Sequence, residues 1–252
     1  MSARELQVAI FGVSGRMGRA VVAAVEESSG AAVKGSTTSS GDPAAALRGA
    51  DVAIEFALPQ ATAAHLSVCV AAKRPIVIGT TGHDGAQRAQ IAAAAREIAI
   101  VMAPNMSLGV NLLLKLVELT AGKLDASYDI EVFEAHHRNK KDAPSGTALA
   151  LGAAAASGRG VKLDEVAEHA RHGTGAGRAR GAIGFSVFRG GDVVGDHTVT
   201  FAGAGERIEL THRASDRMAF ARGAVQAARW LVGRPPGLYS MQDVLATSAI
   251  NL

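Results

Sequence analysis

The sequence has few of the residues that mark secreted, membrane-spanning or nucleic-acid-binding proteins. It contains a single cysteine, Cys69, so an internal disulfide is excluded and a reducing compartment, the cytoplasm, is expected. No apolar run approaches the ~20 residues of a membrane-spanning helix, and no apolar signal segment follows the first residues. Aromatic residues make up 4% of the chain and the net charge is +3, which argues against a base-stacking, nucleic-acid-binding surface. We therefore expect a soluble, cytoplasmic protein with no membrane or nucleic-acid partner.

What the chain does contain is apolar and small residues. Its 252 residues are 48% hydrophobic and include 29 glycines. This length is enough for one large or two modest domains with real cores, and the glycines indicate close backbone contacts.

The first part of the chain alternates short apolar segments with helical ones. The expected strands are 7–11, 33–35, 52–56, 75–78 and 98–102. Such short, nearly continuous apolar strands separated by helices predict an α/β fold with a parallel sheet covered on both faces. Glycine and small polar residues follow the first, fourth and fifth strands, at the edge where open α/β sheets bind ligands.

A glycine motif, Gly12-Val-Ser-Gly-Arg-Met-Gly18, lies between the first strand and a helix that we expect to end near Glu27. In this setting glycines let backbone amides approach a phosphate, and the helix N-terminus attracts its charge. The spacing differs from the G-x-G-x-x-G fingerprint, so a tight strand–helix turn without a ligand is the alternative. The loop after the second strand, Ser36–Ser40, has neither the acid that holds an NAD ribose nor an arginine for a 2′-phosphate, and it leaves NADH and NADPH both open.

The second half of the chain has a different pattern. A long apolar helix over 108–124 precedes a strand over 128–134 with period-two alternation. A helix over 145–156 and strand candidates at 183–188, 197–201 and 207–211 follow. Consecutive strands predict a second α+β domain with a mixed or antiparallel sheet. A final helix from Arg217 could pack back on the first domain, so we expect a dinucleotide-binding domain of residues 1–107 and 217–252 and a substrate-binding and oligomerisation domain of residues 108–216.

The most informative stretch is Glu134–Thr147, which holds two imidazoles, three fixed cations and a helix start. His136 or His137 could donate the proton that hydride transfer to a C=N or C=C bond requires. Lys140 could pair with a carboxylate or polarise the reacting nitrogen, and the amides of Ser145–Thr147 could receive a second carboxylate. Joined to a nicotinamide-binding domain, this stretch predicts hydride transfer to a small dicarboxylate.

Other interpretations of the same stretch are less favoured. Glu134, His136 and His137 could in principle bind zinc, but adjacent histidines diverge on a strand and three nearby cations disfavour a dication, so no metal is expected. Arg138 and Lys141 are expected to face solvent.

Several motifs together resemble one family. They include Gly12–Gly18, Ile78–Gly82 and Ala103–Ser107 in the first domain, and Glu134–Thr147, Gly184–His197 and the run from Gly205 in the second. In this order they resemble the 4-hydroxy-tetrahydrodipicolinate reductase (dihydrodipicolinate reductase) family of the diaminopimelate route to lysine. The resemblance spans nearly the whole chain, and E-x-H-H-x-x-K-x-D-x-P-S-G-T is highly specific to that family.

The resemblance implies an NADH- or NADPH-dependent oxidoreductase that forms tetrahydrodipicolinate, with a Rossmann domain completed by the C-terminal helix. It also implies a homotetramer built by an open mixed sheet. It assigns His136 as proton donor and acceptor, Lys140 as a second catalytic donor, and His137, Gly146 and Thr147 as substrate contacts. The cofactor contacts that it implies, together with Thr38 in the ribose loop, are Gly12, Val13, Ser14, Gly15, Arg16, Met17, Gly79, Thr80, Thr81, Ala103, Pro104, Asn105 and Met106.

Three departures from the family pattern concern the cofactor. Thr38-Ser39 stand where an acid is often found, Glu55-Phe56-Ala57 replaces Asp-Phe-Ser/Thr, and Met106 replaces a phenylalanine. A related reductase or dehydrogenase of another imino or amino diacid, similar to aspartate dehydrogenase, is the alternative enzyme. A nucleotide-sensing protein without catalysis is the alternative outside enzymes, and it would leave the two histidines and Lys140 without a purpose.

Overall fold

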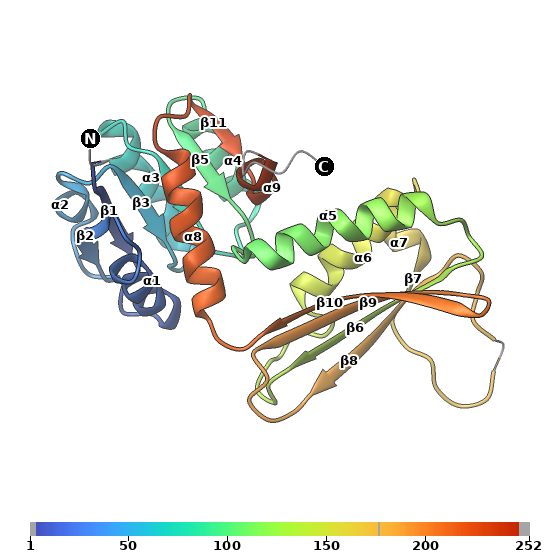
Figure 1. Ribbon diagram of the computed structural model, residues 1–252. Helices are drawn as coiled ribbons and strands as arrows, with labels where there is room; N and C mark the ends of the chain where they lie inside the picture. Colours follow the sequence, from blue (N-terminus) through green and yellow to red (C-terminus); the bar gives the residue numbers. More distant parts are fainter. Residues whose placement is uncertain (1–3, 176, 247–252) are drawn as a thin grey trace. The chain divides into compact units, whose positions relative to one another are not determined.

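A computed structural model describes residues 4–175 and 177–246. The chain divides into two compact units. The first takes its described residues from Met1–Leu108 and Arg217–Leu252, and the second is Gly109–Asp216. The first unit is therefore discontinuous in sequence, with the second unit inserted between its two segments (Figure 1).

The first unit is built on a six-stranded parallel sheet of order β11-β5-β4-β3-β1-β2. Its strands are β1 (Leu6–Phe11), β2 (Ala31–Thr37), β3 (Val52–Glu55), β4 (Ile76–Ile78), β5 (Ala99–Met102) and β11 (Gly237–Tyr239). Its helices are α1 (Arg16–Glu26), α2 (Pro43–Leu47), α3 (Thr62–Ala71), α4 (Gly85–Ala94), α8 (Met218–Leu231) and α9 (Met241–Ala246), with the 3₁₀ turn η1 (Pro59–Ala61).

Both faces of this sheet are buried, as the apolar strands predict. Alternate residues of β1 point to opposite sides: Val8 and Ile10 belong to one core, and Ala9 and Phe11 to the other. The first core is closed by α1 and the alanine-rich face of α8, and the second by helices α2, α3 and α4 (Figure 1). The parallel, doubly covered sheet confirms the predicted fold class.

This sheet has one strand more than the five that the sequence predicts. β11 pairs in parallel with β5, so that Gly237 lies beside Ala99 and Tyr239 beside Val101. This short strand comes from the last part of the chain and forms an edge of the sheet.

The second unit contains a five-stranded mixed sheet of order β10-β9-β6-β8-β7. Its strands are β6 (Asp129–His136), β7 (Ala167–Glu168), β8 (Ile183–Arg189), β9 (Gly195–Gly203) and β10 (Glu206–Ala214). Its helices are α6 (Gly146–Gly158), α7 (Leu163–Val166) and α5 (Leu108–Lys123), whose first residue belongs to the first unit. β6 and β8 are parallel, whereas β6 and β9 are antiparallel, as expected of a mixed sheet.

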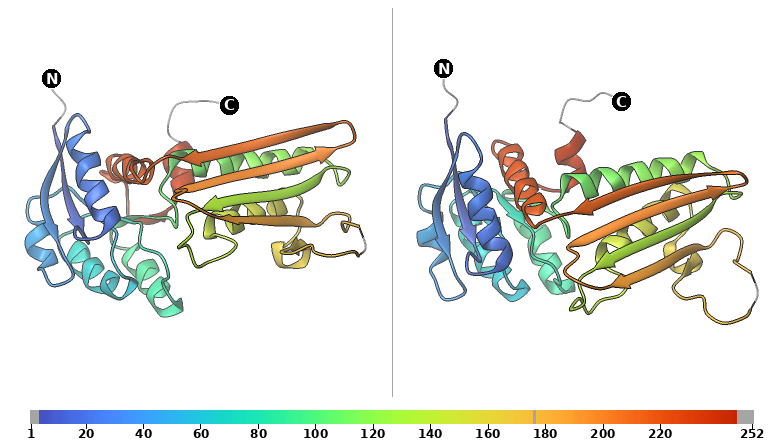
Figure 2. Two further views of the ribbon diagram at one scale, coloured as in Figure 1. Left: turned by 90° about the horizontal axis from the view of Figure 1, so that it is seen from below. Right: turned by 60° about the horizontal axis from the view of Figure 1, so that its bottom comes forward.

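Helices α5 and α6 lie on one face of this sheet (Figure 2). Ile130 and Val132 of β6 point toward them and are fully buried. The opposite face bears Phe133, 44% exposed, and Phe188, 47% exposed. Among the residues that the structure describes, no helix packs on this outer face, which therefore presents apolar side chains at its surface.

Candidate active site

The glycine motif forms a tight turn between β1 and α1. Gly12 has a φ of +88°, a conformation that favours glycine, and a Cβ there would lie 2.2 Å from the carbonyl oxygen of Phe56. A Cβ on Gly18 would lie 2.2 Å from the carbonyl oxygen of Gly12. Both glycines therefore allow the turn to pack closely against its neighbours.

The start of α1 is open to ligands. Gly15 is the N-cap residue, is exposed, and has no side chain that could cap the helix. The first amides of a helix have no acceptor within it, and they carry partial positive charge. Val13, Ser14, Arg16 and Met17 are all half-buried or exposed around this turn. The arrangement fits a phosphate group of a dinucleotide.

Two further turns lie at the same edge of the sheet. Strand register places the end of β1 next to β3, β3 next to β4, and β4 next to β5. After β4, a Cβ on Gly79 would lie 2.2 Å from the ring of Phe56, so the turn rests on that ring. Thr80 is buried and Thr81 is exposed.

The third turn, after β5, runs from Ala103 to Met106. A Cβ on Gly223 of α8 would lie 1.8 Å from the carbonyl oxygen of Met106, so the absence of a side chain there lets α8 contact this turn directly. The Met106 side chain is 1% exposed and belongs to the core beneath α8. Pro104 is exposed, and the Asn105 side chain accepts a hydrogen bond from the Ser107 amide. Thr38, after β2, is exposed.

In the second unit, Glu134 and His136 lie on the same face of β6. Glu134 is fully buried, and its Oε2 accepts a hydrogen bond from His136 Nδ1 at 2.5 Å. Arg189 of β8 donates to both oxygens of Glu134, each at 2.8 Å, and the Ser145 amide donates to Oε1 at 3.0 Å. One carboxylate thus receives four N–H groups and orients the imidazole.

The Glu134 carboxylate also determines which nitrogen of the His136 ring carries a proton, and it affects the pKa of that ring. A carboxylate acceptor at Nδ1 requires a proton on that nitrogen and leaves Nε2 for chemistry. A Cβ on Gly195 would lie 3.1 Å from His136 Nε2, so the glycine leaves room beside this atom. Burial lowers the pKa of His136 below its usual value, and the Glu134 carboxylate opposes that shift. Burial opposes ionisation of Glu134, yet Arg189, His136 and the Ser145 amide hold its pKa below the usual value.

Ser145 connects this cluster to the start of α6. Its side chain is the N-cap of the helix and accepts a hydrogen bond from the Ala148 amide at 3.2 Å. The same hydroxyl lies 3.2 Å from Nε2 of His197, a buried residue of β9 whose ring meets the His136 ring edge to face at 5.1 Å. Burial lowers the pKa of His197 to about 4, so this ring is neutral near pH 7.

The other residues predicted for this site surround the cluster. His137 follows directly after β6 and is half-buried. The Lys140 side chain is 22% exposed, and its Nζ lies 2.9 Å from Asp142 Oδ2. At the start of α6, Gly146 is exposed and Thr147 is half-buried. All of these residues lie near the end of β6 or in the first turn of α6.

Arg138 and Lys141 are exposed at the same end of β6.

Sequence reasoning did not assign functional roles to Glu134, Arg189 or His197. The sequence suggests Glu134 only as a possible metal ligand, although period-two alternation places it on the same face as His136. Arg189 and His197 come from β8 and β9, the two neighbours of β6 in the sheet. Within the described ranges 4–175 and 177–246, no group of three His, Cys, Asp or Glu side chains is arranged to hold a metal ion.

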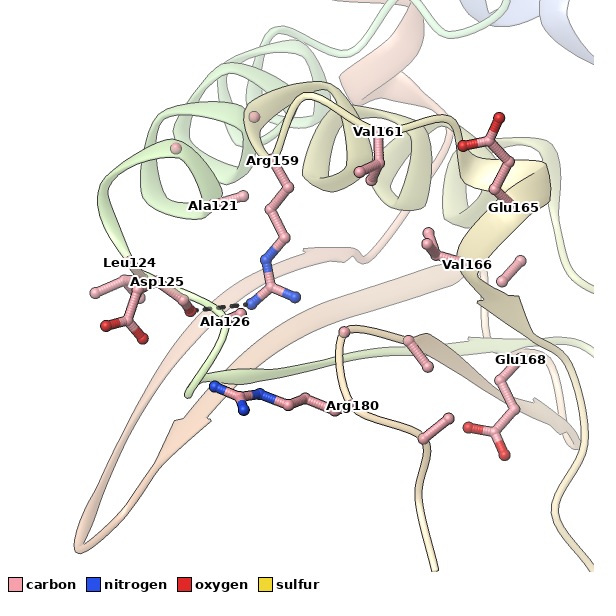
Figure 3. A pocket seen from close by; sticks show the side chains of 16 residues that line it. Ala121, Leu124, Asp125, Ala126, Arg159, Val161, Glu165, Val166, Glu168 and Arg180 are labelled. Carbon is pink, nitrogen blue, oxygen red and sulfur yellow. Dashed lines mark hydrogen bonds between the residues drawn. The ribbon is translucent and has the colours of Figure 1, made fainter.

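A cavity of 740 Å³ lies elsewhere in the second unit (Figure 3). It is lined by the C-terminal ends of α5 and α6, including Ala121 and Arg159. The Arg159 guanidinium donates to the carbonyl oxygen of Asp125 at 3.5 Å. Helix α6, whose 13 residues span roughly 20 Å, separates this cavity from Ser145, and none of the predicted site residues lines it.

Comparisons with known proteins identify the family of the chain. The family model "Dihydrodipicolinate reductase, N-terminus" matches residues 6–106, and "Dihydrodipicolinate reductase, C-terminus" matches residues 109–245. The 4-hydroxy-tetrahydrodipicolinate reductase of Thiobacillus denitrificans is 51% identical, over 95% of this chain and 98% of that protein. That of Alkalilimnicola ehrlichii is 50% identical over the same shares.

Among solved structures, the dipicolinate-bound dihydrodipicolinate reductase from Paenisporosarcina sp. TG-14 has a similar fold. It aligns with a TM-score of 0.76 and 24% identity, over 94% of this chain and 97% of that one. No helix in the described part of the chain is both long and apolar enough to span a membrane. By the matches to both family models and to relatives of about half identity over nearly its full length, the chain belongs to the dihydrodipicolinate reductase family.

Proposed function

We propose that this protein reduces 4-hydroxy-tetrahydrodipicolinate to tetrahydrodipicolinate with NADH or NADPH, in the diaminopimelate route to lysine. Membership of the reductase family supports this activity. The observation that carries the chemistry is the buried Glu134–His136 pair beside the N-terminus of α6.

The proposed role of His136 is to donate a proton from Nε2. Reduction of a C=N or C=C bond by hydride leaves negative charge on the neighbouring atom, and a nearby acid must neutralise it. Glu134 favours the doubly protonated ring and fixes its orientation, while Arg189 and the Ser145 amide hold Glu134. Lys140 is proposed as a second donor, whose ammonium group stabilises charge that develops during the reaction.

The proposed substrate carries two carboxylates. Gly146 and Thr147 lie in the first turn of α6, where the backbone amides and the helix dipole favour an anion. His137 and Lys140 lie close in sequence at the end of β6 and can contact the substrate as well. We therefore assign His137, Gly146 and Thr147 to substrate binding and His136 with Lys140 to catalysis.

The first unit is proposed to bind the dinucleotide at the edge described above. Gly12–Met17 would hold its phosphates, Thr38 its ribose, and Gly79–Thr81 with Ala103–Met106 its nicotinamide end. The bound cofactor supplies the hydride. The open N-terminus of α1 and the close packing at Gly12 and Gly18 support this assignment.

The decisive experiment is a coupled assay. The purified protein should oxidise NADH or NADPH only when the unstable substrate is generated in the cuvette. Other imino or amino diacids, aspartate with NAD⁺ among them, should give much lower rates. Absence of turnover with either cofactor would refute the proposed activity, and comparable rates with aspartate would favour an aspartate dehydrogenase-like enzyme.

We also propose that the protein is a cytoplasmic homotetramer and that the outer face of the second sheet forms its interface. Phe133 and Phe188 are about half exposed on that face, and apolar patches of this kind mark association surfaces. Phe133→Glu should shift the mass measured by light scattering from the tetramer toward smaller species, whereas Leu119→Glu, on the exposed side of α5, should not. An unchanged mass for Phe133→Glu would contradict this interface.

A further inference from the structure

A second fully buried carboxylate lies in the first unit. Glu55 is the last residue of β3 and has no exposed surface. Its Oε1 accepts hydrogen bonds from two hydroxyls, Thr62 Oγ1 at 2.7 Å and Thr80 Oγ1 at 2.9 Å. Its Oε2 lies 3.4 Å from Nδ1 of His65, which is also buried. The family pattern has a shorter aspartate at this position.

The cluster extends to one more buried ring. His83 is 4% exposed, and its Nε2 lies 2.9 Å from Thr62 Oγ1. Because Thr62 gives its proton to Glu55, the His83 nitrogen is the donor in that contact. Burying a carboxylate is costly unless hydrogen bonds compensate it, so the hydrogen bonds from the Thr62 and Thr80 hydroxyls stabilise the buried Glu55 side chain.

One of these partners belongs to the proposed cofactor edge. Thr80 lies in the turn Gly79–Thr81, and its Oγ1 accepts a hydrogen bond from the Ala57 amide at 2.9 Å while it donates to Glu55. The Gly79 amide donates to the backbone oxygen of Glu55 at 2.9 Å. The side chain and the backbone of Glu55 therefore both bind this turn, and the ring of Phe56 packs against Gly79.

We propose that Glu55 is a positioning residue for cofactor binding. Through the Thr80 hydroxyl it holds the Gly79–Thr81 turn in the conformation that receives the nicotinamide end of NADH or NADPH. The inference rests on the proposed function, because it requires that this turn contacts the cofactor. Thr62 donates to the same carboxylate oxygen from helix α3. Its hydroxyl contacts Glu55 and His83, two residues beyond the turn, rather than the turn itself, so we expect it to stabilise the fold with little effect on the site.

The two threonines provide a matched pair of variants. Thr80→Val and Thr62→Val each remove one buried hydroxyl from Glu55 Oε1 at nearly constant volume. NADH affinity is measured by fluorescence of the bound cofactor without substrate, and thermal unfolding is measured in parallel. Both variants should lose similar stability. Thr80→Val should raise the Kd for NADH by about tenfold, the size of one lost hydrogen bond to a charged group, whereas Thr62→Val should change it less than about twofold.

Two further variants test whether Glu55 acts through Thr80. Thr80→Ser keeps the hydroxyl and should have a near-normal affinity for NADH. Glu55→Gln keeps an acceptor but removes the charge, which should weaken NADH binding about threefold. This effect should disappear in the Thr80→Val background, because the two residues act as one unit.

The outcomes separate the inference from the proposed function. Hydrogen exchange of the wild-type protein shows whether NADH slows the amides of Gly79–Thr81. If NADH leaves them unchanged, the cofactor contact and this inference are both wrong. If the amides are protected but Thr80→Val and Thr62→Val have the same Kd, or Glu55→Gln acts independently of Thr80, only the positioning role is overturned.

Discussion

Replacing Glu134 by glutamine tests the chemistry of the second unit most directly. The substitution preserves shape, yet four N–H groups converge on the two oxygens: His136 Nδ1 and one Arg189 nitrogen on Oε2, and the other Arg189 nitrogen and the Ser145 amide on Oε1. A carboxamide must turn its NH₂ group toward one of these pairs. Either orientation opposes donors to donors and leaves the Arg189 charge without its partner.

The expected loss is large for turnover. If the NH₂ group faces His136, the ring accepts at Nδ1 and stays neutral, so Nε2 becomes a poor acid. Positioned general acids contribute about 10²–10⁴-fold, and we expect kcat to fall about 10³-fold, or about 4 kcal/mol. The Glu134 carboxylate raises the pKa of His136 against the effect of burial. Its loss should therefore lower that pKa further. Because the acid form is active, the pH above which the rate declines should move to a lower value.

Glu131→Gln is the matched control. Glu131 lies on the same strand and also pairs with arginines, Arg171 and Arg178, but its side chain is 30% exposed. Its replacement should leave kcat and the pH profile unchanged. Steady-state kinetics across pH, with thermal unfolding of each variant, complete the assay. A Glu134→Gln enzyme that is folded and within threefold of wild-type kcat would refute the role of Glu134, and an equal loss in Glu131→Gln would indicate a general disturbance of β6.

Three further predictions concern neighbouring groups. His136→Ala and Lys140→Ala should each lower kcat by about 10²–10⁴-fold, with a smaller effect on substrate binding, whereas Arg138→Ala should be near wild type. Steady-state kinetics measure these effects, and normal turnover in both the His136 and Lys140 variants would overturn the assignment. Since the loop at Thr38 has neither an acid nor an arginine, NADH and NADPH should both support turnover, with initial rates within about tenfold; strict use of one cofactor would contradict this. Burial lowers the pKa of His197 from 6.5 to about 4, so its neutral ring stabilises the fold above pH 6.5, and up to about 3 kcal/mol is lost as the pH falls toward 4. His197→Gln should flatten that part of the stability curve in urea titrations, and an unchanged slope would show that His197 does not titrate as described.

The local pattern of apolar residues predicts five strands of the first sheet but not its edge strand β11. The five predicted strands are short apolar runs, whose burial on both faces is visible in their composition. β11 contains only Gly237-Leu238-Tyr239, and Leu238 is 52% exposed. These three residues form a strand because they pair with β5, and a sequence of three residues does not reveal that pairing.

The active-site cluster was predictable along β6 but not across the sheet. Alternation alone places Glu134 and His136 on one face. Arg189 follows Glu134 by 55 residues, and the hydrogen bond between them depends on β8 lying beside β6 in parallel. His197 meets Ser145 only because β9 occupies the other side of β6. The order of strands in a sheet is a long-range property, so both residues looked like ordinary surface or structural positions.

The discontinuity of the first unit has a consequence for the nascent protein. Helix α8 covers one face of the parallel sheet, and Ala221, Ala224 and Leu231 have no exposed surface. A ribosome delivers the whole second unit before α8 and β11 are available. An N-terminal domain usually folds first during synthesis, but here the glycine motif emerges early and gains the support of α8 only after the second unit has been synthesised. Until then α1 is present on this face of the sheet, but the apolar residues that α8 covers in the folded protein remain exposed.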